Sequence, residues 1–160
     1  MTGPALVVAC AVVVFVWPGG RAALEYDRAA ILSGEPWRLL TGHWTHVSVS
    51  HLFYDAVVLG LAGVIVTARG YGRFVPLCVL SAVAIGLAML ALLPDMATYG
   101  GLSGVAMAVA VSMGLHAMRD ASPWRELGGL VLFLCASRLA LDATSGGPVL
   151  ADLDGGAVVT

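Results

Sequence analysis

The amino-acid sequence predicts an all-α, polytopic membrane protein with six transmembrane helices in a single domain over residues 1–160. Apolar residues make up 59% of the chain and charged residues 11%, and the mean hydropathy is +0.93. A soluble domain is about a quarter charged, so this chain lacks the charged surface that water requires. Six apolar runs are bounded by charges or helix-breaking residues; they cover residues 4–18, 52–68, 74–93, 101–118, 125–141 and 147–160.

The runs differ in how well they match the roughly 17–25 residues that a spanning helix needs. The four middle runs fit. The first, 4–18, precedes the first charge of the chain, Arg21, so we expect a retained span rather than a cleaved signal peptide, which begins with basic residues. The last, 147–160, would extend about 21 Å against a hydrocarbon core of about 30 Å. We therefore expect that the native chain continues or that this span is incomplete.

One long loop, residues 19–51, separates the first and second helices. Arginines cluster in two other connections, Arg69 with Arg73 and Arg119 with Arg125. An even number of spans lies between these connections, so both face the same side, and the positive-inside rule makes that side cytoplasmic. The sequence predicts a multi-pass protein of a bacterial-type inner (plasma) membrane, with its N-terminus in the cytoplasm and the long loop outside.

Composition also excludes several function classes. A net charge of −2 without any lysine argues against nucleic acid, which needs clustered basic side chains. The three cysteines, Cys10, Cys78 and Cys135, lie in separate apolar runs and show no metal or redox spacing. We expect them to be small apolar side chains, without metal or redox chemistry.

Polar residues within spans are costly, so each is a candidate site. Ser103 lies in the segment Tyr99-Gly100-Gly101-Leu102-Ser103-Gly104. Glycines on both sides of a serine near a helix start leave backbone N–H groups uncovered, which suits a nucleophile with an oxyanion hole. The alternative is helix packing, because Gly100, Gly104 and Ala108 form a stripe of small residues. Spacing alone leaves both interpretations open.

Two further groups contain ionisable residues. The first group consists of His43, His46, His51 and Asp55. Within it, His51 and Asp55 are four residues apart and share one helix face. The spacing of the group matches no zinc pattern, so we favour polar groups that face a water-filled cavity over a metal site. In the second, Asp152 and Asp154 enter the sixth run. Asp152 lies at the same depth as Ser103 on a helix of the same direction, which permits a hydrogen bond between neighbours. The alternative is a hydrated, frayed helix end.

Taken together, these segments resemble the rhomboid intramembrane serine proteases. The family has Trp-Arg in its first loop, then a His-x-x-x-x-His-x-x-x-Asn block, a Gly-x-Ser-Gly nucleophile motif and an Ala-His-x-x-Gly motif. The corresponding segments are Trp37-Arg38, His46 to Asp55, Gly101-Leu102-Ser103-Gly104 and Ala151-Asp152-Leu153-Asp154-Gly155. The upstream segment 24–28 and the compact size look most like the rhombosortase branch, which is thought to cut proteins bearing a C-terminal Gly-Gly sorting anchor.

The resemblance implies a role for each matching residue. Ser103 would be the nucleophile, and His51 with Gly104 would form the oxyanion hole, with Asp55 at the position of an oxyanion-hole asparagine. It implies no metal and no cofactor. The remaining matching positions would support the motifs or belong to the loop in the outer leaflet: Trp37, Arg38, His46, Gly101 and Gly155.

Two residues depart from the family pattern. The Asp55 carboxylate would repel a developing oxyanion unless it is protonated or turned away. Asp152 occupies the position of the catalytic histidine, and an ordinary aspartate, with a pKa near 3.9, is about three units too acidic for a base near neutral pH. Burial would raise this pKa, so a weakened activity is compatible with the sequence.

The sequence predicts an intramembrane serine endopeptidase that cleaves a transmembrane or C-terminal sorting anchor of exported proteins. Its expected partners are that membrane protein substrate and the lipid bilayer. The alternative is a catalytically impaired rhomboid-like protein that binds transmembrane segments without cleaving them. A small transporter or channel would call for inverted repeats, which the sequence does not show.

Overall fold

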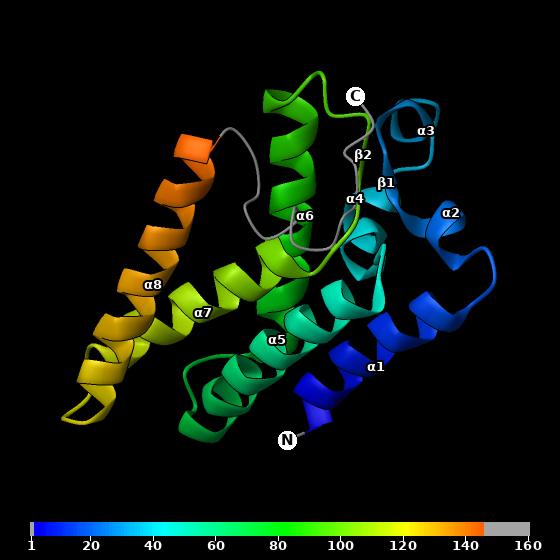
Figure 1. Ribbon diagram of the computed structural model, residues 1–160. Helices are drawn as coiled ribbons and strands as arrows, with labels where there is room; N and C mark the ends of the chain where they lie inside the picture. The colour runs from blue at the N-terminus through cyan, green and yellow to red at the C-terminus, as the bar shows by residue number, and fades with distance from the viewer. Residues whose placement is uncertain (1, 146–160) are drawn as a thin grey trace. The chain divides into compact units, whose positions relative to one another are not determined.

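Helices account for most of the chain that the structure describes, residues 2–145 (Figure 1). In this computed structural model, five apolar helices coincide with the first five predicted runs. They are α1 (Thr2–Val16), α5 (Val49–Arg69), α6 (Phe74–Leu92), α7 (Ser103–Ala117) and α8 (Trp124–Ser145). The sixth run, 147–160, lies outside the described residues.

Three of these helices are long and apolar enough to cross a membrane. They are α5 with 21 residues, α6 with 19, and α8, whose apolar part has 21. The apolar helices α1 and α7 have 15 residues each, or about 22 Å at 1.5 Å per residue, against a hydrocarbon core of about 30 Å. The chain is therefore a mostly helical membrane protein with three helices of spanning length in its described part. The count of six spans stays a prediction.

Local signals in the sequence account for the two ends of α5. Before its first turn, the Ser48 hydroxyl oxygen accepts a hydrogen bond of 3.1 Å from the His51 backbone N–H, which satisfies a donor without a partner in the helix. At the other end, Gly70 adopts a left-handed φ of 65°, a conformation that glycine takes at little cost. The Ser48 cap places His51 and Asp55 in the first two turns of α5.

The long loop folds into short elements that the sequence did not predict. It contains α2 (Gly20–Leu24), α3 (Arg28–Leu32), α4 (Arg38–Thr41) and the 3₁₀ helix η1 (Gly42–Trp44). It also contains the strand β1 (Tyr26–Asp27), which pairs antiparallel with β2 (Thr98–Tyr99) and sets Tyr26 opposite Tyr99. The prediction of an all-helical protein is therefore wrong for these two short strands, because two segments far apart in sequence exchange backbone hydrogen bonds.

This pairing attaches the loop to the connection that precedes α7. Next to the ladder, the Arg28 guanidinium donates a hydrogen bond of 2.9 Å to the Leu90 carbonyl at the end of α6, where helix carbonyls lack partners in the helix. Tyr26 of β1 forms a buried apolar cluster with Ile31 and Met89. The segment before Ser103 is therefore held by backbone pairing, a charged cap and apolar packing.

The chain divides into two compact units, Met1–Val109 and a second that begins at Ala110. In the first unit, α1 packs against α5 and α6. In the second, glycines allow the end of α7 to approach α8 closely, because a Cβ atom on Gly128 would lie 2.7 Å from the Gly114 carbonyl oxygen. A single domain over residues 1–160 stays a prediction.

Candidate active site

Ser103 is the first residue of α7, and its side chain is exposed. Its hydroxyl oxygen lies 3.4 Å from the Tyr99 hydroxyl oxygen, and the Tyr99 hydroxyl donates a hydrogen bond of 3.1 Å to the Gly101 carbonyl. Burial raises the pKa of the Tyr99 phenol, so the phenol stays protonated at neutral pH. No role for Tyr99 follows from the sequence alone, although Tyr99 begins the segment that contains Ser103.

Glycine is required at two positions before Ser103. Gly101 has a φ of 136°, a conformation that residues with a side chain rarely adopt, and a Cβ atom there would lie 2.7 Å from the His51 ring carbon Cε1. A Cβ atom on Gly100 would lie 2.5 Å from the Thr45 hydroxyl oxygen. These glycines bring the backbone before Ser103 onto α5 and the end of the long loop.

Helix packing explains only part of the small-residue stripe. Gly104 does face α6, since a Cβ atom on it would lie 3.1 Å from Ile85 Cδ1. Gly100, however, precedes α7 and therefore cannot belong to a stripe on that helix. The structure assigns the first glycines to the approach toward His51 and Thr45, and Gly104 to helix packing.

His46, His51 and Asp55 form one cluster around a shared carboxylate. The Nε2 atoms of His46 and His51 lie 3.2 and 3.4 Å from the same Asp55 oxygen, Oδ2, and the two imidazole rings meet edge to face at 5.1 Å. Asp55 and His46 are buried, whereas the His51 side chain is 27% exposed. The predicted placement of His51 and Asp55 on one helix face is observed, and the carboxylate is directed at two imidazoles.

No group of three or more potential metal-binding side chains has the required geometry among residues 2–145. Both imidazoles of the cluster are directed at one carboxylate oxygen, Asp55 Oδ2. The same carboxylate oxygen, Asp55 Oδ2, would also lie 3.5 Å from a Cβ atom on Gly101. His51 is the member of the cluster with exposed surface, and its ring contacts the backbone at Gly101.

His43, which the sequence analysis grouped with His46 and His51, packs against Tyr99. Its Nε2–H donates a hydrogen bond of 2.9 Å to the Ala82 carbonyl, and its ring meets the Tyr99 ring edge to face at 5.5 Å. The residue is buried, and this burial lowers the pKa of His43 below its usual value of 6.5. A neutral His43 in η1 therefore contacts both the ring of Tyr99 and the backbone of α6.

Arg38 and Trp37 occupy different environments although they are adjacent. The buried Arg38 guanidinium donates to the carbonyl oxygens of Ala22 and Glu25 at 3.1 and 2.9 Å and pairs with the Glu35 carboxylate at 2.5 Å. Trp37 is 50% exposed. Arg38 thus ties α2 to α4 inside the long loop, while Trp37 presents an aromatic surface. Three other predicted positions, Asp152, Asp154 and Gly155, lie outside the described residues.

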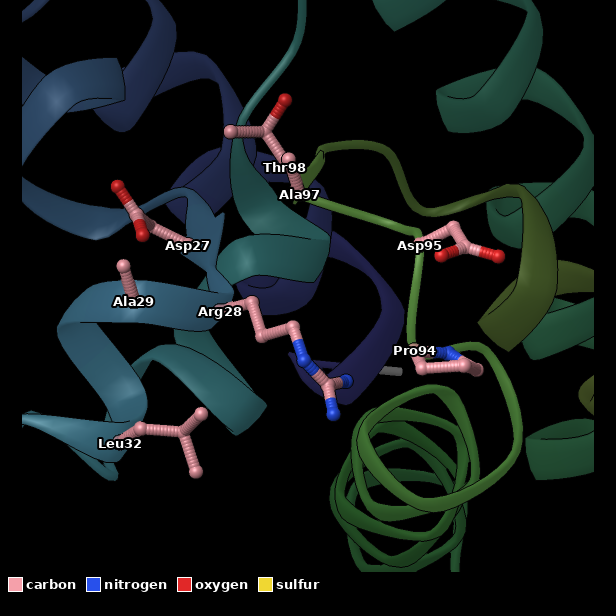
Figure 2. A pocket seen from close by; sticks show the side chains of 8 residues that line it. All are labelled: Asp27, Arg28, Ala29, Leu32, Pro94, Asp95, Ala97 and Thr98. Atoms are coloured by element: carbon pink, nitrogen blue, oxygen red, sulfur yellow. The ribbon is translucent and has the colours of Figure 1, made fainter.

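A pocket of 380 Å³ opens beside β1 and β2 (Figure 2). Its walls come from the start of α3 and from the connection between α6 and β2, and Figure 2 shows the Arg28 side chain extending toward the end of α6. None of the residues predicted to form the active site lines this pocket. The pocket is therefore separate from the surface around Ser103.

The helices and the candidate site together define a polytopic membrane protein with an exposed serine that follows a glycine turn. Residues 33–149, more than half of the chain, match the family model of the Rhomboid domain. The chain therefore belongs to the rhomboid family, a family of intramembrane serine proteases. No curated protein matches the chain. The family match includes Ser103 and the His46–Asp55 segment and ends before Asp152.

Proposed function

We propose that this protein is an intramembrane serine endopeptidase in which Ser103 attacks the scissile carbonyl. The observation that carries the proposal is the position of Ser103: it is exposed at the start of α7, directly after a glycine turn that contacts the ring of His51. A nucleophile needs an accessible oxygen and nearby hydrogen-bond donors for the oxyanion that forms. The Gly104 backbone and His51 are the proposed donors.

The other site residues have supporting roles in this proposal. Asp55 orients His51 rather than contacting substrate, since its Oδ2 atom already lies near two imidazoles. His46 completes that cluster, and Gly101 allows the close approach. Arg38 stabilises the loop that presents Trp37 to the outer leaflet. The reaction requires no metal and no cofactor, because serine acyl transfer needs only proton transfer and oxyanion stabilisation.

For the substrate, we propose an exported protein with a transmembrane or C-terminal sorting anchor. The support is the resemblance of the upstream loop, Leu24 to Arg28, to the rhombosortase branch. This proposal keeps the prediction from the sequence that the run 147–160 is the sixth span, with Asp152 at the level of Ser103. Asp152 would accept the Ser103 proton poorly, since an ordinary carboxylate is several units too acidic.

That substitution favours a second candidate function. A rhomboid-like protein without the dyad histidine could bind transmembrane segments and release them uncut. The two candidates differ in the reactivity of Ser103, which a serine-directed fluorophosphonate probe measures on the purified protein without knowledge of the substrate. Labelling that disappears in Ser103→Ala supports the endopeptidase. Absence of labelling in the wild type and in Asp152→His would favour the binding protein.

Cleavage of an anchored Gly-Gly substrate is the second arm of the test. Asp152→His should raise cleavage on the order of 10²–10⁴-fold, because general acid–base groups contribute that much. Ser103→Ala in the Asp152→His background should remove the gain. Strong wild-type cleavage that is unaffected by Asp152→Ala would show that Asp152 is not the base.

We propose a bacterial-type inner membrane, with the N-terminus in the cytoplasm and the active site opening outward. The support is the arginine-rich connections between α5 and α6 and between α7 and α8. Reporter fusions at Gly72 and Ser122 should report the cytoplasm, and a fusion at Ala97 should report the outside. An external signal at Gly72 would reverse this orientation.

A further inference from the structure

The hydroxyl of Tyr99 has two neighbours that matter for proton transfer. One is the Ser103 hydroxyl oxygen at 3.4 Å, and the other is the Gly101 carbonyl, which accepts the Tyr99 proton at 3.1 Å. Within the part of the chain that the structure describes, Tyr99 is the side chain within hydrogen-bonding distance of the Ser103 hydroxyl. The two hydroxyls can therefore form a chain in which Ser103 donates to Tyr99 and Tyr99 donates onward.

Tyr99 is held firmly in this position. Its backbone lies in β2, opposite Tyr26 of β1, and its ring packs on the apolar cluster formed with Ile31 and Met89. The His43 ring meets it edge to face at 5.5 Å. Strand pairing and ring packing leave the hydroxyl little freedom, and such positioning is what proton transfer in an active site requires.

We propose that Tyr99 is a catalytic residue that relays the Ser103 proton to the leaving group. As the Ser103 oxygen forms its bond to the substrate carbonyl carbon, its proton passes to the Tyr99 oxygen. Tyr99 gives its own proton to the nitrogen of the amide as the carbon–nitrogen bond breaks. One proton enters Tyr99 and one leaves it, so the phenol is restored without any other base. This inference rests on the proposed function of Ser103 as nucleophile.

The protonation state of Tyr99 fits a relay and not a simple base. Burial raises the pKa of its phenol, which ordinarily lies near 10, so a phenolate is scarce at neutral pH. The nearby titratable groups are Asp55 of α5 and His43 of η1; the Asp55 charge also raises this pKa. A proton relay requires a protonated phenol, and burial together with the Asp55 charge keeps the proton on the Tyr99 oxygen.

The three histidines nearest Ser103 in the described structure are engaged in other contacts. His43 directs Nε2 at the Ala82 carbonyl, and His46 and His51 direct theirs at Asp55. The Tyr99 hydroxyl, in contrast, already touches the attacking oxygen. A relay through Tyr99 also explains how Ser103 can react although an aspartate occupies the position of the dyad histidine.

The test compares Tyr99→Phe with Tyr26→Phe by the rate of fluorophosphonate labelling of the full chain in detergent micelles. In labelling, the Ser103 proton passes through Tyr99 to the departing fluoride. Tyr99→Phe keeps the ring and should slow labelling by about 100-fold or more, the contribution of a positioned acid–base group. Tyr26 is the matched control: it is the cross-strand partner, and its buried hydroxyl makes no hydrogen bond within the described residues. Tyr26→Phe should label at the wild-type rate.

The same comparison in the Asp152→His background separates a relay from a structural role. An imidazole at position 152 offers the Ser103 proton a second route, so Tyr99→Phe should cost less than about 10-fold there. Equal losses in both backgrounds would show that Tyr99 only supports the fold. An unchanged rate in Tyr99→Phe, or labelling that appears only with Asp152→His, would overturn the relay. Absence of labelling in every background would refute the proposed function itself.

Discussion

Gly101→Ala tests whether the turn before Ser103 depends on contact with His51. The new Cβ atom would lie 2.7 Å from Cε1 and 2.8 Å from Nε2 of His51. Carbon atoms in contact are about 3.5 Å apart, so the ring or the turn must move by about 0.8 Å. The ring cannot move alone, because its Nε2 lies 3.4 Å from the buried Asp55 carboxylate.

The expected cost has two parts. The backbone at Gly101 has a φ of 136°, and an alanine in such a region costs about 1–3 kcal/mol. Inserting a methyl group into a packed contact costs about 1–3 kcal/mol more. We expect the free energy of unfolding to fall by roughly 2–6 kcal/mol. A displacement of about 1 Å near a nucleophile can cost about 100-fold in rate.

Thermal unfolding in detergent micelles and fluorophosphonate labelling measure these two effects. Gly60→Ala is the matched control, because a Cβ atom at Gly60 in α5 meets no atom within 4 Å. In that helix, alanine should stabilise by about 0.5–1 kcal/mol and leave labelling unchanged. If Gly101→Ala unfolds and labels like Gly60→Ala, the contact between the glycine turn and His51 does not exist in the protein.

Two further predictions concern the long loop. Burial lowers the pKa of His43, so below about pH 6.5 the unfolded chain binds more protons than the folded chain does. The free energy of unfolding should therefore be at its full value above that pH and fall below it by up to about 1.4 kcal/mol per pH unit. His43→Gln, which keeps a donor for Ala82, should weaken this dependence in unfolding measured from pH 5 to 8, and an unchanged slope would exclude His43 as its source. Arg38→Ala leaves the Glu35 carboxylate and two carbonyls unpaired and should lower the free energy of unfolding by about 2–4 kcal/mol. Trp37→Ala should change it by less than about 1 kcal/mol, and equal losses would contradict the assigned hydrogen bonds.

Local patterns in the sequence were sufficient to predict the apolar helices and one contact of the site. The five apolar helices follow the first five apolar runs, because a helix satisfies the backbone polar groups that an apolar run removes from water. Helix geometry likewise brings residues four apart together, which is why the contact between His51 and Asp55 could be predicted. The resemblance to the rhomboid family was also visible in the sequence, and the family match confirms that the chain belongs to it.

Contacts between distant segments required the tertiary structure. The pairing of Tyr26 with Tyr99 and the convergence of His46 and His51 on one Asp55 oxygen depend on how the long loop folds back. Strand pairing has no local periodicity in segments of two residues, so no pattern in the sequence indicates it. The sequence by itself determined the membrane class and the five apolar helices, and it pointed to Ser103 as the candidate nucleophile. Tertiary packing decided which side chains reach that serine, because it brings together residues that are separated along the chain.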